Sequence, residues 1–259
     1  MRILVLLKQV PASDVGGMDA AIGLLRRDQG EKRVNPHDAA ALEAGLRLRE
    51  AAGGTLELMS MGPPSAREAL AEALALGADA AALLCGEGFR GADVLATARA
   101  LAAACRLLGP YDALLCGAFT TDGGTGHTPG TLAALLGLPY YAGVEEVAAS
   151  PGGLLLTQTL TCTRQKLLLC APAVLAIAPE AYRLRLPTLP GRLAARSRPV
   201  RVLPPEALAL PPEALGLAGS PTRVVRVETL RRGPAAPPIS GEARDMAERI
   251  YACFREAPL

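Results

Sequence analysis

The chain has 259 residues and a mass of 26.7 kDa, enough for one large α/β domain with an extension or for two small domains. Its 27 basic residues nearly balance 25 acidic ones, and it has three Phe, five Tyr and no Trp. This composition argues against a nucleic-acid-binding protein, which normally needs a clear excess of positive charge or aromatic rings for stacking.

The six cysteines are spread singly along the chain, and there are only two histidines. We therefore expect neither a zinc site nor an iron–sulfur cluster, and we interpret the cysteines as reduced thiols of a cytoplasmic protein. The N-terminal apolar run stops at Lys8, which favours a first strand over a signal peptide. The longest apolar stretch, residues 167–178, is too short to span a bilayer, so we expect no insertion into a membrane.

The first half of the chain alternates strand-like and helix-like segments. Residues 2–10 form an apolar run typical of a strand buried on both faces of a parallel sheet, whereas residues 13–32 carry no clear signal. Asn35 can cap a helix that begins at Pro36, and Asp38 suits the positive end of its dipole. This helix should pack through Leu42, Leu46 and Leu48. Further along, the spacing predicts strands over 55–61, 80–85 and 113–116, a helix opened by a capping box at 65–68, and helices over 92–108 and through 132–136. This alternation implies right-handed βαβ units and a parallel sheet.

The second half has a different pattern. Strand candidates at 143–147, 154–160, 166–169 and 173–177 follow one another without a helix, which indicates hairpins appended to the parallel core. From Pro179 the chain is rich in Pro and Arg, with six arginines and no acidic residue between Arg183 and Arg201. We interpret this part as an extended C-terminal arm that lies on another subunit, because it has little material for a core of its own.

A glycine-rich stretch at 120–130 carries the strongest site signal. It follows a predicted strand and precedes a predicted helix, so its backbone N–H groups can surround an anion at the helix N-terminus. The stretch has neither the Lys of a Walker A loop nor the glycine spacing of a Rossmann fingerprint. The alternative is a flexible turn. We favour phosphate binding, because residues 8–11 and the turn at Gly62 should reach the same edge of the sheet.

Catalysis by side chains is not expected. His127 lies near Asp122, but no nucleophile in a suitable context accompanies them, and no pair of carboxylates suggests acid–base chemistry.

These stretches together resemble the β subunit of electron transfer flavoprotein, including its nitrogen-fixation-associated relatives. The matching segments are ILVLLKQVP (3–11), VNPHDAAALEAGLRLRE (34–50), LMSMGPPSAREALAEALALGADAA (58–81), GADVLATARALA (91–102), YDALLCGAFTTDGGTGHTPGTLAALLGLP (111–139) and LPTLPGRLAARSRPV (186–200). The resemblance implies a doubly wound, mostly parallel α/β domain of the adenine-nucleotide-binding type over 1–185. It also implies a recognition loop and C-terminal arm over 186–259 that pack on a homologous α subunit.

The resemblance further implies an electron carrier that is not itself an enzyme. In such a heterodimer FAD is shared with the α subunit, AMP lies in the β subunit, and electrons pass from flavin dehydrogenases, such as the acyl-CoA dehydrogenases of fatty acid oxidation, to a membrane quinone oxidoreductase. The residues at the positions that contact AMP are Leu6, Asn35, Met61, Gly123, Gly126, His127 and Thr128. Leu189 stands at the position that docks into partner dehydrogenases.

Several positions differ from the usual family pattern: Ala12, the pair Gly126-His127, Thr159, the segment 182–184, and residues 194–198, where a lysine run is usual. These differences concern the phosphate contacts and the choice of dehydrogenase. Two rival functions remain open. One is an electron-bifurcating form with a second FAD in place of AMP, and the other is a stand-alone nucleotide-binding protein of the universal-stress type.

Overall fold

The structure is a computed structural model that describes residues 1–12, 18–19, 24–25, 31–170, 172–225 and 238–256. The chain divides into two compact units, residues 1–225 and residues 226–259. The unassigned stretch 13–32 lies mostly outside the described residues, which show there only the short pair β3 (Met18–Asp19) and β4 (Leu24–Leu25) and the start of β5 (Lys32–Val34).

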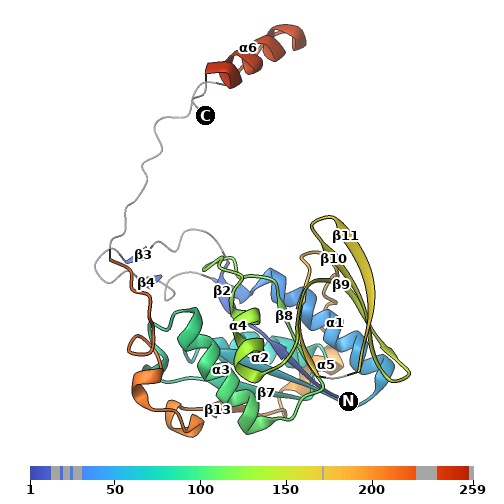
Figure 1. Cartoon of the computed structure of the whole chain (residues 1–259), viewed down its shortest axis with the longest axis vertical. Helices are drawn as coiled ribbons and strands as arrows, with labels where there is room; N and C mark the ends of the chain where they lie inside the picture. The colour runs from blue at the N-terminus through green and yellow to red at the C-terminus, as the bar shows by residue number, and fades with distance from the viewer. Residues whose placement is uncertain (13–17, 20–23, 26–30, 171, 226–237, 257–259) are drawn as a thin grey trace. The chain divides into compact units, whose positions relative to one another are not determined.

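The first unit is built on a nine-stranded sheet with the order β11-β10-β9-β12-β8-β1-β6-β7-β13 (Figure 1). Strand β1 lies between β6 and β8 and is parallel to both. The strands are β1 (Arg2–Leu6), β6 (Thr55–Met61), β7 (Ala80–Leu84), β8 (Ala113–Gly117), β9 (Tyr140–Ser150), β10 (Gly153–Leu160), β11 (Thr163–Leu169), β12 (Ala173–Ile177) and β13 (Val200–Leu203). A separate two-stranded ribbon pairs β2 (Gln9–Pro11) with β5.

Helices cover both faces of the sheet, so the predicted doubly wound α/β fold is confirmed. Alternate residues of β1 point to opposite cores: Ile3 and Val5 to one, Leu4 and Leu6 to the other. The first core includes α1 (Pro36–Ala52) and α2 (Ala66–Ala75), and the second includes α3 (Val94–Leu108) and α4 (Thr128–Leu136). The predicted inward leucines of α1 are all buried in the first core.

Two predicted helix caps are wrong, although both helices begin where expected. The side chains of Asn35 and Ser65 make no capping hydrogen bond. Ser65 instead donates from Oγ to Gln9 Oε1 at 3.1 Å and accepts from Lys32 Nζ at 2.9 Å. Contacts with distant segments thus outcompete the local cap, and they tie the β2–β5 ribbon to α2.

The expectation of appended hairpins is confirmed for β9, β10 and β11 and is wrong for β12. Strand β10 is antiparallel to both β9 and β11. Strand β12 lies inside the core instead, parallel to β8 and to β9. All five of its residues are buried, as an apolar strand covered by helices on both faces requires.

The compact unit extends to Val225, beyond the boundary expected at 185. After α5 (Leu189–Ala195), which lies beside α2, strand β13 adds to the edge of the sheet parallel to β7. The short helices η2 (Pro205–Leu208) and η3 (Pro212–Ala214) follow, and Leu203, Leu208 and Leu215 join the second core. Packing of the arm on another subunit stays a prediction.

The second unit contains α6 (Ala243–Glu256). The side chains of Ile250, Tyr251 and Phe254 in this helix are exposed. None of the helices in the described part of the chain combines the length and apolar character that a membrane span requires.

Candidate functional site

Three strand ends meet at the carboxyl edge of the parallel sheet. Leu6 ends β1 and pairs in register with Met59 of β6, two residues before Met61 ends that strand. On the other side of β1, Val5 pairs with Leu115, two residues before β8 ends at Gly117. In parallel α/β sheets, ligands bind outside this edge. The predicted positions Leu6 and Met61 therefore share an edge with the start of the glycine-rich loop.

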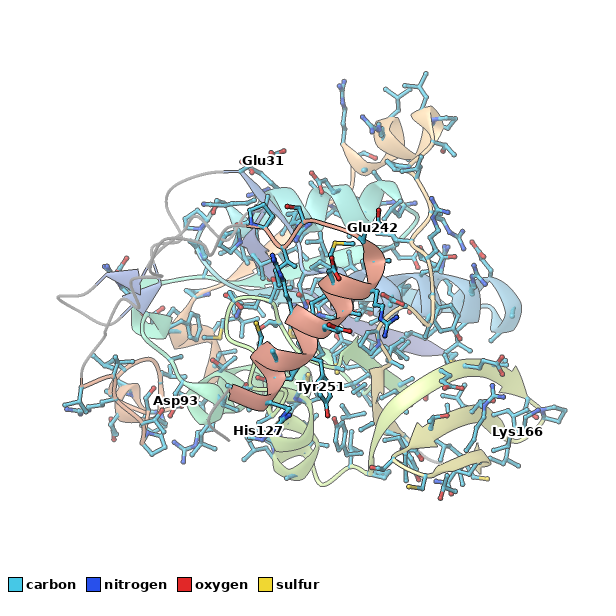
Figure 2. All side chains as sticks on the ribbon, turned by 90° about the horizontal axis from the view of Figure 1, so that it is seen from above. Glu31, Asp93, His127, Lys166, Glu242 and Tyr251 are labelled. Carbon is cyan, nitrogen blue, oxygen red and sulfur yellow. The ribbon has the colours of Figure 1, made fainter. Side chains whose placement is uncertain are left out.

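The glycine-rich loop connects Gly117 of β8 to Thr128 of α4. Gly124 and Gly126 adopt φ of 62° and 65°, a left-handed conformation that side chains with a Cβ rarely take. The N-cap residue His127 is exposed and makes no capping hydrogen bond with its side chain (Figure 2). The first N–H groups of a helix have no partner within the helix and carry partial positive charge. The loop and helix start can therefore receive an anion.

Asn35 holds this loop against the start of α1. Its side chain is fully buried, donates from Nδ2 to the carbonyl oxygen of Phe119 at 2.9 Å, and accepts at Oδ1 from the N–H of Thr121 at 3.3 Å. The amide thus bonds loop backbone rather than the first turn of its own helix. Its contact with AMP stays a prediction.

Asp38 connects the ends of β1 and β8. Its buried carboxylate accepts from the backbone N–H of Lys8 at 2.8 Å and of Gly117 at 3.1 Å. Burial raises the pKa of Asp38 to about 7, despite these hydrogen bonds, which favour the charged form. A Cβ at Gly117 would lie 2.6 Å from Asp38 Oδ1, so the contact requires glycine there. The sequence suggested for Asp38 only a helix-dipole role, because nothing local indicates the partner 79 residues away.

An ion pair joins Lys8 to the glycine-rich loop. Lys8 Nζ lies 2.7 Å from Asp122 Oδ1, and the Asp122 side chain is 2% exposed. The sequence drew attention to the proximity of Asp122 to His127, whereas the structure pairs this carboxylate with a residue that follows β1. A neighbouring contact stacks His37 on Phe119, with ring centroids 3.8 Å apart, and burial lowers the pKa of His37.

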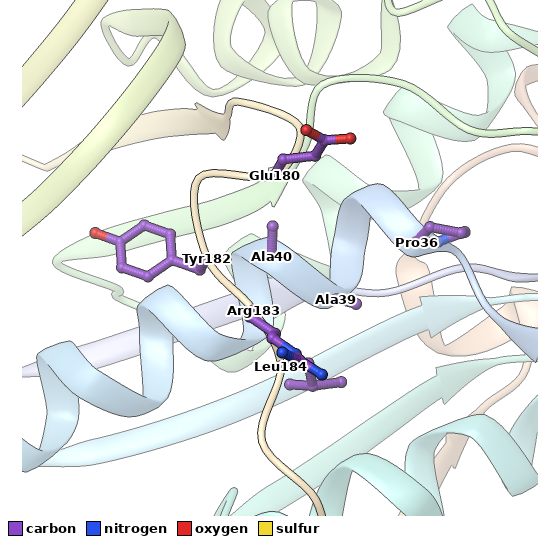
Figure 3. Close-up of a pocket in the computed structure, with 7 residues that line it drawn as sticks. All are labelled: Pro36, Ala39, Ala40, Glu180, Tyr182, Arg183 and Leu184. Atoms are coloured by element: carbon purple, nitrogen blue, oxygen red, sulfur yellow. The ribbon is translucent and has the colours of Figure 1, made fainter.

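A separate cavity of about 380 Å³ lies between the first turns of α1 and the segment 180–184 (Figure 3). Its walls include Pro36 and Ala40 from the helix and Tyr182 and Leu184 from the segment. None of the residues predicted to contact AMP lines it. The described residues contain no cluster of His, Cys, Asp or Glu that could hold a metal ion.

The unusual segment 182–184 is held by specific contacts. The Tyr182 hydroxyl accepts a hydrogen bond from the N–H of Val147 in β9 at 2.9 Å, and the Arg47 guanidinium lies 5.5 Å from the ring centroid. Thr159 is exposed on β10, and Ala12 donates its N–H to the carbonyl oxygen of Glu31. These positions are thus accommodated by the fold.

Leu189 begins α5 and is 71% exposed. Thr188 caps the helix, because its Oγ1 accepts from the N–H of Gly191 at 3.1 Å. The structure thus presents the predicted docking leucine on the surface.

Comparison with known proteins decides the family. A family model described as the electron transfer flavoprotein domain matches residues 23–208. The chain belongs to the electron transfer flavoprotein family. It is 34% identical over 251 residues to the electron transfer flavoprotein subunit beta of Thermoanaerobacterium thermosaccharolyticum, covering 96% of both chains. It is 35% identical to the caffeyl-CoA reductase-Etf complex subunit CarD of Acetobacterium woodii, covering 87% of each, and 34% identical to the protein FixA of Bradyrhizobium diazoefficiens, covering 96% of this chain and 86% of that one.

Family membership agrees with the expectation from the sequence motifs. Beta subunits and FixA proteins are among the relatives, and they match the chain over most of its length. Membership favours a partnered electron-transfer subunit over a stand-alone nucleotide-binding protein. The flavoprotein family also implies that a flavin takes part.

Proposed function

We propose that this chain is the β subunit of a heterodimeric electron transfer flavoprotein. The complex accepts electrons from flavin dehydrogenases, such as the acyl-CoA dehydrogenases of fatty acid oxidation, and delivers them to a membrane quinone oxidoreductase. The family match over most of the chain supports this proposal. The proposal includes a cytoplasmic location, as expected for reduced thiols.

We further propose that AMP lies at the carboxyl edge of the sheet. The observation that carries this step is the glycine-rich loop, whose left-handed glycines lead directly into the start of α4. Gly123, Gly126, His127 and Thr128 would surround the phosphate with backbone N–H groups. Leu6, Asn35 and Met61 would contact the nucleoside. The residues fit such a ligand because the glycines at 123 and 124 are exposed and a Cβ at Gly124 would meet nothing within 4 Å.

FAD bound between the subunits supplies the redox chemistry, through electron transfer at its isoalloxazine ring. The β chain contributes a wall of the flavin site, the rigid carboxyl edge and the docking residue Leu189. No side chain of this subunit is assigned a catalytic step.

A second candidate is an electron-bifurcating form in which another FAD replaces AMP. Two relatives favour keeping it: one is named for a caffeyl-CoA reductase-Etf complex, and the other is the acryloyl-CoA reductase electron transfer subunit gamma of Anaerotignum propionicum, 31% identical over 263 residues. The glycine-rich loop suits either ligand, because both present an adenosine phosphate.

The deciding experiment is co-expression with a homologous α subunit, purification of the complex, denaturation and chromatography of the released nucleotides. One FAD and one AMP per heterodimer are expected. Two FAD would establish the second candidate. If no α subunit co-purifies and the lone chain carries no nucleotide, the proposed function is wrong.

A further inference from the structure

The first turn of α1 joins the end of β1 to the glycine-rich loop. Asn35 donates its backbone N–H to the carbonyl oxygen of Lys8 at 2.8 Å, and its side chain bonds the backbone of the loop. In the same turn, Asp38 accepts the N–H of Lys8 at Oδ2 and the N–H of Gly117 at Oδ1. The place where the loop begins is therefore held by the Asp38 carboxylate.

The packing around Gly117 transmits any movement of that carboxylate. A Cβ at Gly117 would lie 2.6 Å from Asp38 Oδ1 and 2.6 Å from the carbonyl carbon of His37. The end of β8 thus lies directly against the backbone of α1. Asp38 is buried, so its oxygens depend on these backbone donors rather than on water.

The Asp38 carboxylate is buried without a cation of its own. Within the part of the chain that the structure describes, no basic side chain forms an ion pair with it, and the nearby Lys8 ammonium is bonded to Asp122. Burial raises the pKa of Asp38 to about 7, although hydrogen bonds from Lys8, Asn35 and Gly117 favour the ionised form. The group can therefore gain or lose its proton near neutral pH.

Two further titratable groups lie close to Asp38. Burial, and after it the charge of Asp38, raises the pKa of the Cys116 thiol on β8, so this thiol stays protonated near neutral pH. Beside Asp38 on α1, the ring of His37 stacks on Phe119, and burial lowers the pKa of this histidine. A test of Asp38 must therefore separate its titration from that of His37.

The charge of Asp38 decides how many backbone N–H groups it can hold. An ionised carboxylate accepts at both oxygens, whereas a protonated acid carries a hydrogen on one of them. Each oxygen of Asp38 already faces an N–H group. A proton on either oxygen would face a donor, so one of the two bonds would be lost. By linkage, an ordered junction of the two strand ends favours the ionised form, and the ionised form favours the ordered junction.

We propose that Asp38 is a positioning residue whose ionised carboxylate draws the ends of β1 and β8 together, so that nucleotide retention at the glycine-rich loop falls when Asp38 is protonated. A bound nucleotide orders the loop and favours the ionised form, and Asp38 then releases its proton to solvent. This inference rests on the proposed function, because it adds a dependence on pH to the nucleotide site proposed there.

Isothermal titration calorimetry of AMP with the purified heterodimer, freed of this nucleotide, tests the coupling. Asp38→Asn mimics the protonated acid at every pH. The ratio of the wild-type association constant to that of Asp38→Asn should be roughly ten near pH 8 and approach one near pH 5.5, the tenfold change that one pKa unit produces. A ratio that does not change with pH overturns the proposal. A ratio that rises as the pH falls also overturns it, because the carboxylate would then merely repel the phosphate.

His37→Gln is the matched control. It removes the neighbouring titratable ring and keeps the Asp38 carboxyl group, so the affinity for AMP should follow the wild-type dependence on pH. A dependence that disappears in His37→Gln would assign the effect to the histidine and overturn the role of Asp38.

Proton release provides a second measurement that needs no variant and therefore decides the matter even if Asp38→Asn does not fold. Titration of the wild-type complex with AMP at pH 7, in two buffers with different enthalpies of ionisation, measures the protons released on binding. We expect roughly 0.3–0.5 proton per AMP if binding lowers the pKa of Asp38 by about one unit. A phosphate with a pKa near 6 is already mostly ionised at pH 7 and contributes little. No release, or an uptake of protons, overturns the proposal.

Failure of this inference is distinguishable from failure of the proposed function. Binding of AMP that is independent of Asp38 overturns the inference alone. A complex that binds no AMP at any pH overturns the proposed AMP site. If that complex carries two FAD, the same titrations with FAD decide the inference, and if it binds neither nucleotide here, both proposals are wrong.

Discussion

Lys8, which follows β1, and Asp122, which lies in the glycine-rich loop, are 114 residues apart in sequence, yet Lys8 Nζ is 2.7 Å from Asp122 Oδ1. Because the Asp122 carboxylate is almost completely buried, its charge depends on nearby donors. This contact links the end of a central strand to the loop that we propose holds the nucleotide phosphate.

Lys8→Met should therefore destabilise the fold by roughly 1–3 kcal/mol, because it removes the cation that pairs with a buried carboxyl group at 2.7 Å. Asp122→Asn in the same chain should restore part of this loss, since the neutral amide does not depend on the cation at Lys8 as the carboxyl group does. Equilibrium urea unfolding of the two single variants and the double variant measures the coupling. Losses that simply add would show that the two side chains act independently.

Asn35→Ala should release the loop from α1. It removes two hydrogen bonds to loop backbone from a fully buried position, which we expect to cost roughly 2–3 kcal/mol. Exchange of the Thr121 amide should accelerate, and less nucleotide should remain on the purified complex. Unchanged exchange at Thr121 would mean that the loop keeps its conformation without the amide.

Asp38 should make stability depend on pH in an unusual direction. Its pKa is about 7 in the folded chain and 3.8 ordinarily, so between pH 4 and 7 the folded chain holds a proton that the unfolded chain has released. Stability therefore falls as pH rises through this window, by up to roughly 4 kcal/mol at about 1.4 kcal/mol per pKa unit. Asp38→Asn lacks this contribution. The difference in unfolding free energy between wild type and variant should follow the fall; a constant difference from pH 4 to 7 would contradict it.

Gly126→Asp should weaken nucleotide retention. The substitution adds negative charge at the proposed phosphate site and also strains a residue with φ of 65°. Gly126→Asn is the matched control, because Asn tolerates this conformation better than most residues and carries no charge. We expect the nucleotide content to be highest in the wild type, lower in Gly126→Asn and lowest in Gly126→Asp. Equal content in the two variants would show that the added charge has no influence there.

Leu189→Ala should slow electron transfer from a dehydrogenase by roughly 10- to 100-fold without loss of flavin, because a docked leucine contributes about 1.5–3 kcal/mol of apolar burial. Leu155→Ala removes another exposed leucine, on β10, and should not affect transfer. Stopped-flow reduction of the complex measures both. Transfer at the wild-type rate in Leu189→Ala would exclude this leucine from docking.

Local patterns predicted the elements of the parallel core closely. The strand over 55–61 has the predicted bounds, and Asn35, Pro36 and Asp38 indicated the start of α1 correctly. Local patterns failed to predict side-chain contacts that depend on residues far away in the sequence. The Asn35 side chain could equally well cap α1. It bonds to the backbone of the glycine-rich loop instead, because a buried amide has no water to bond and must find protein partners.

The edge strand β13 could not be predicted for a similar reason. Val200–Leu203 is only four residues long and lies between Pro199 and Pro204, so nothing local distinguishes it from the rest of a Pro-rich arm. Residues 200–203 form a strand because they pair with β7 at the edge of the sheet, and β7 lies more than a hundred residues earlier in the chain. The ion pair between Lys8 and Asp122 likewise depends on the completed sheet.

The absence of buried side chains on α5 makes partner choice separable from folding. The exposed leucines of this helix, Leu189 and Leu193, can be exchanged for the residues of another carrier without leaving a hole in either core. Arg185, Gly191, Ala195 and Arg198 must be kept, because they touch the rest of the molecule. With Leu189 as the proposed docking residue, a graft of these seven residues is a practical way to test whether the carrier then serves a different partner.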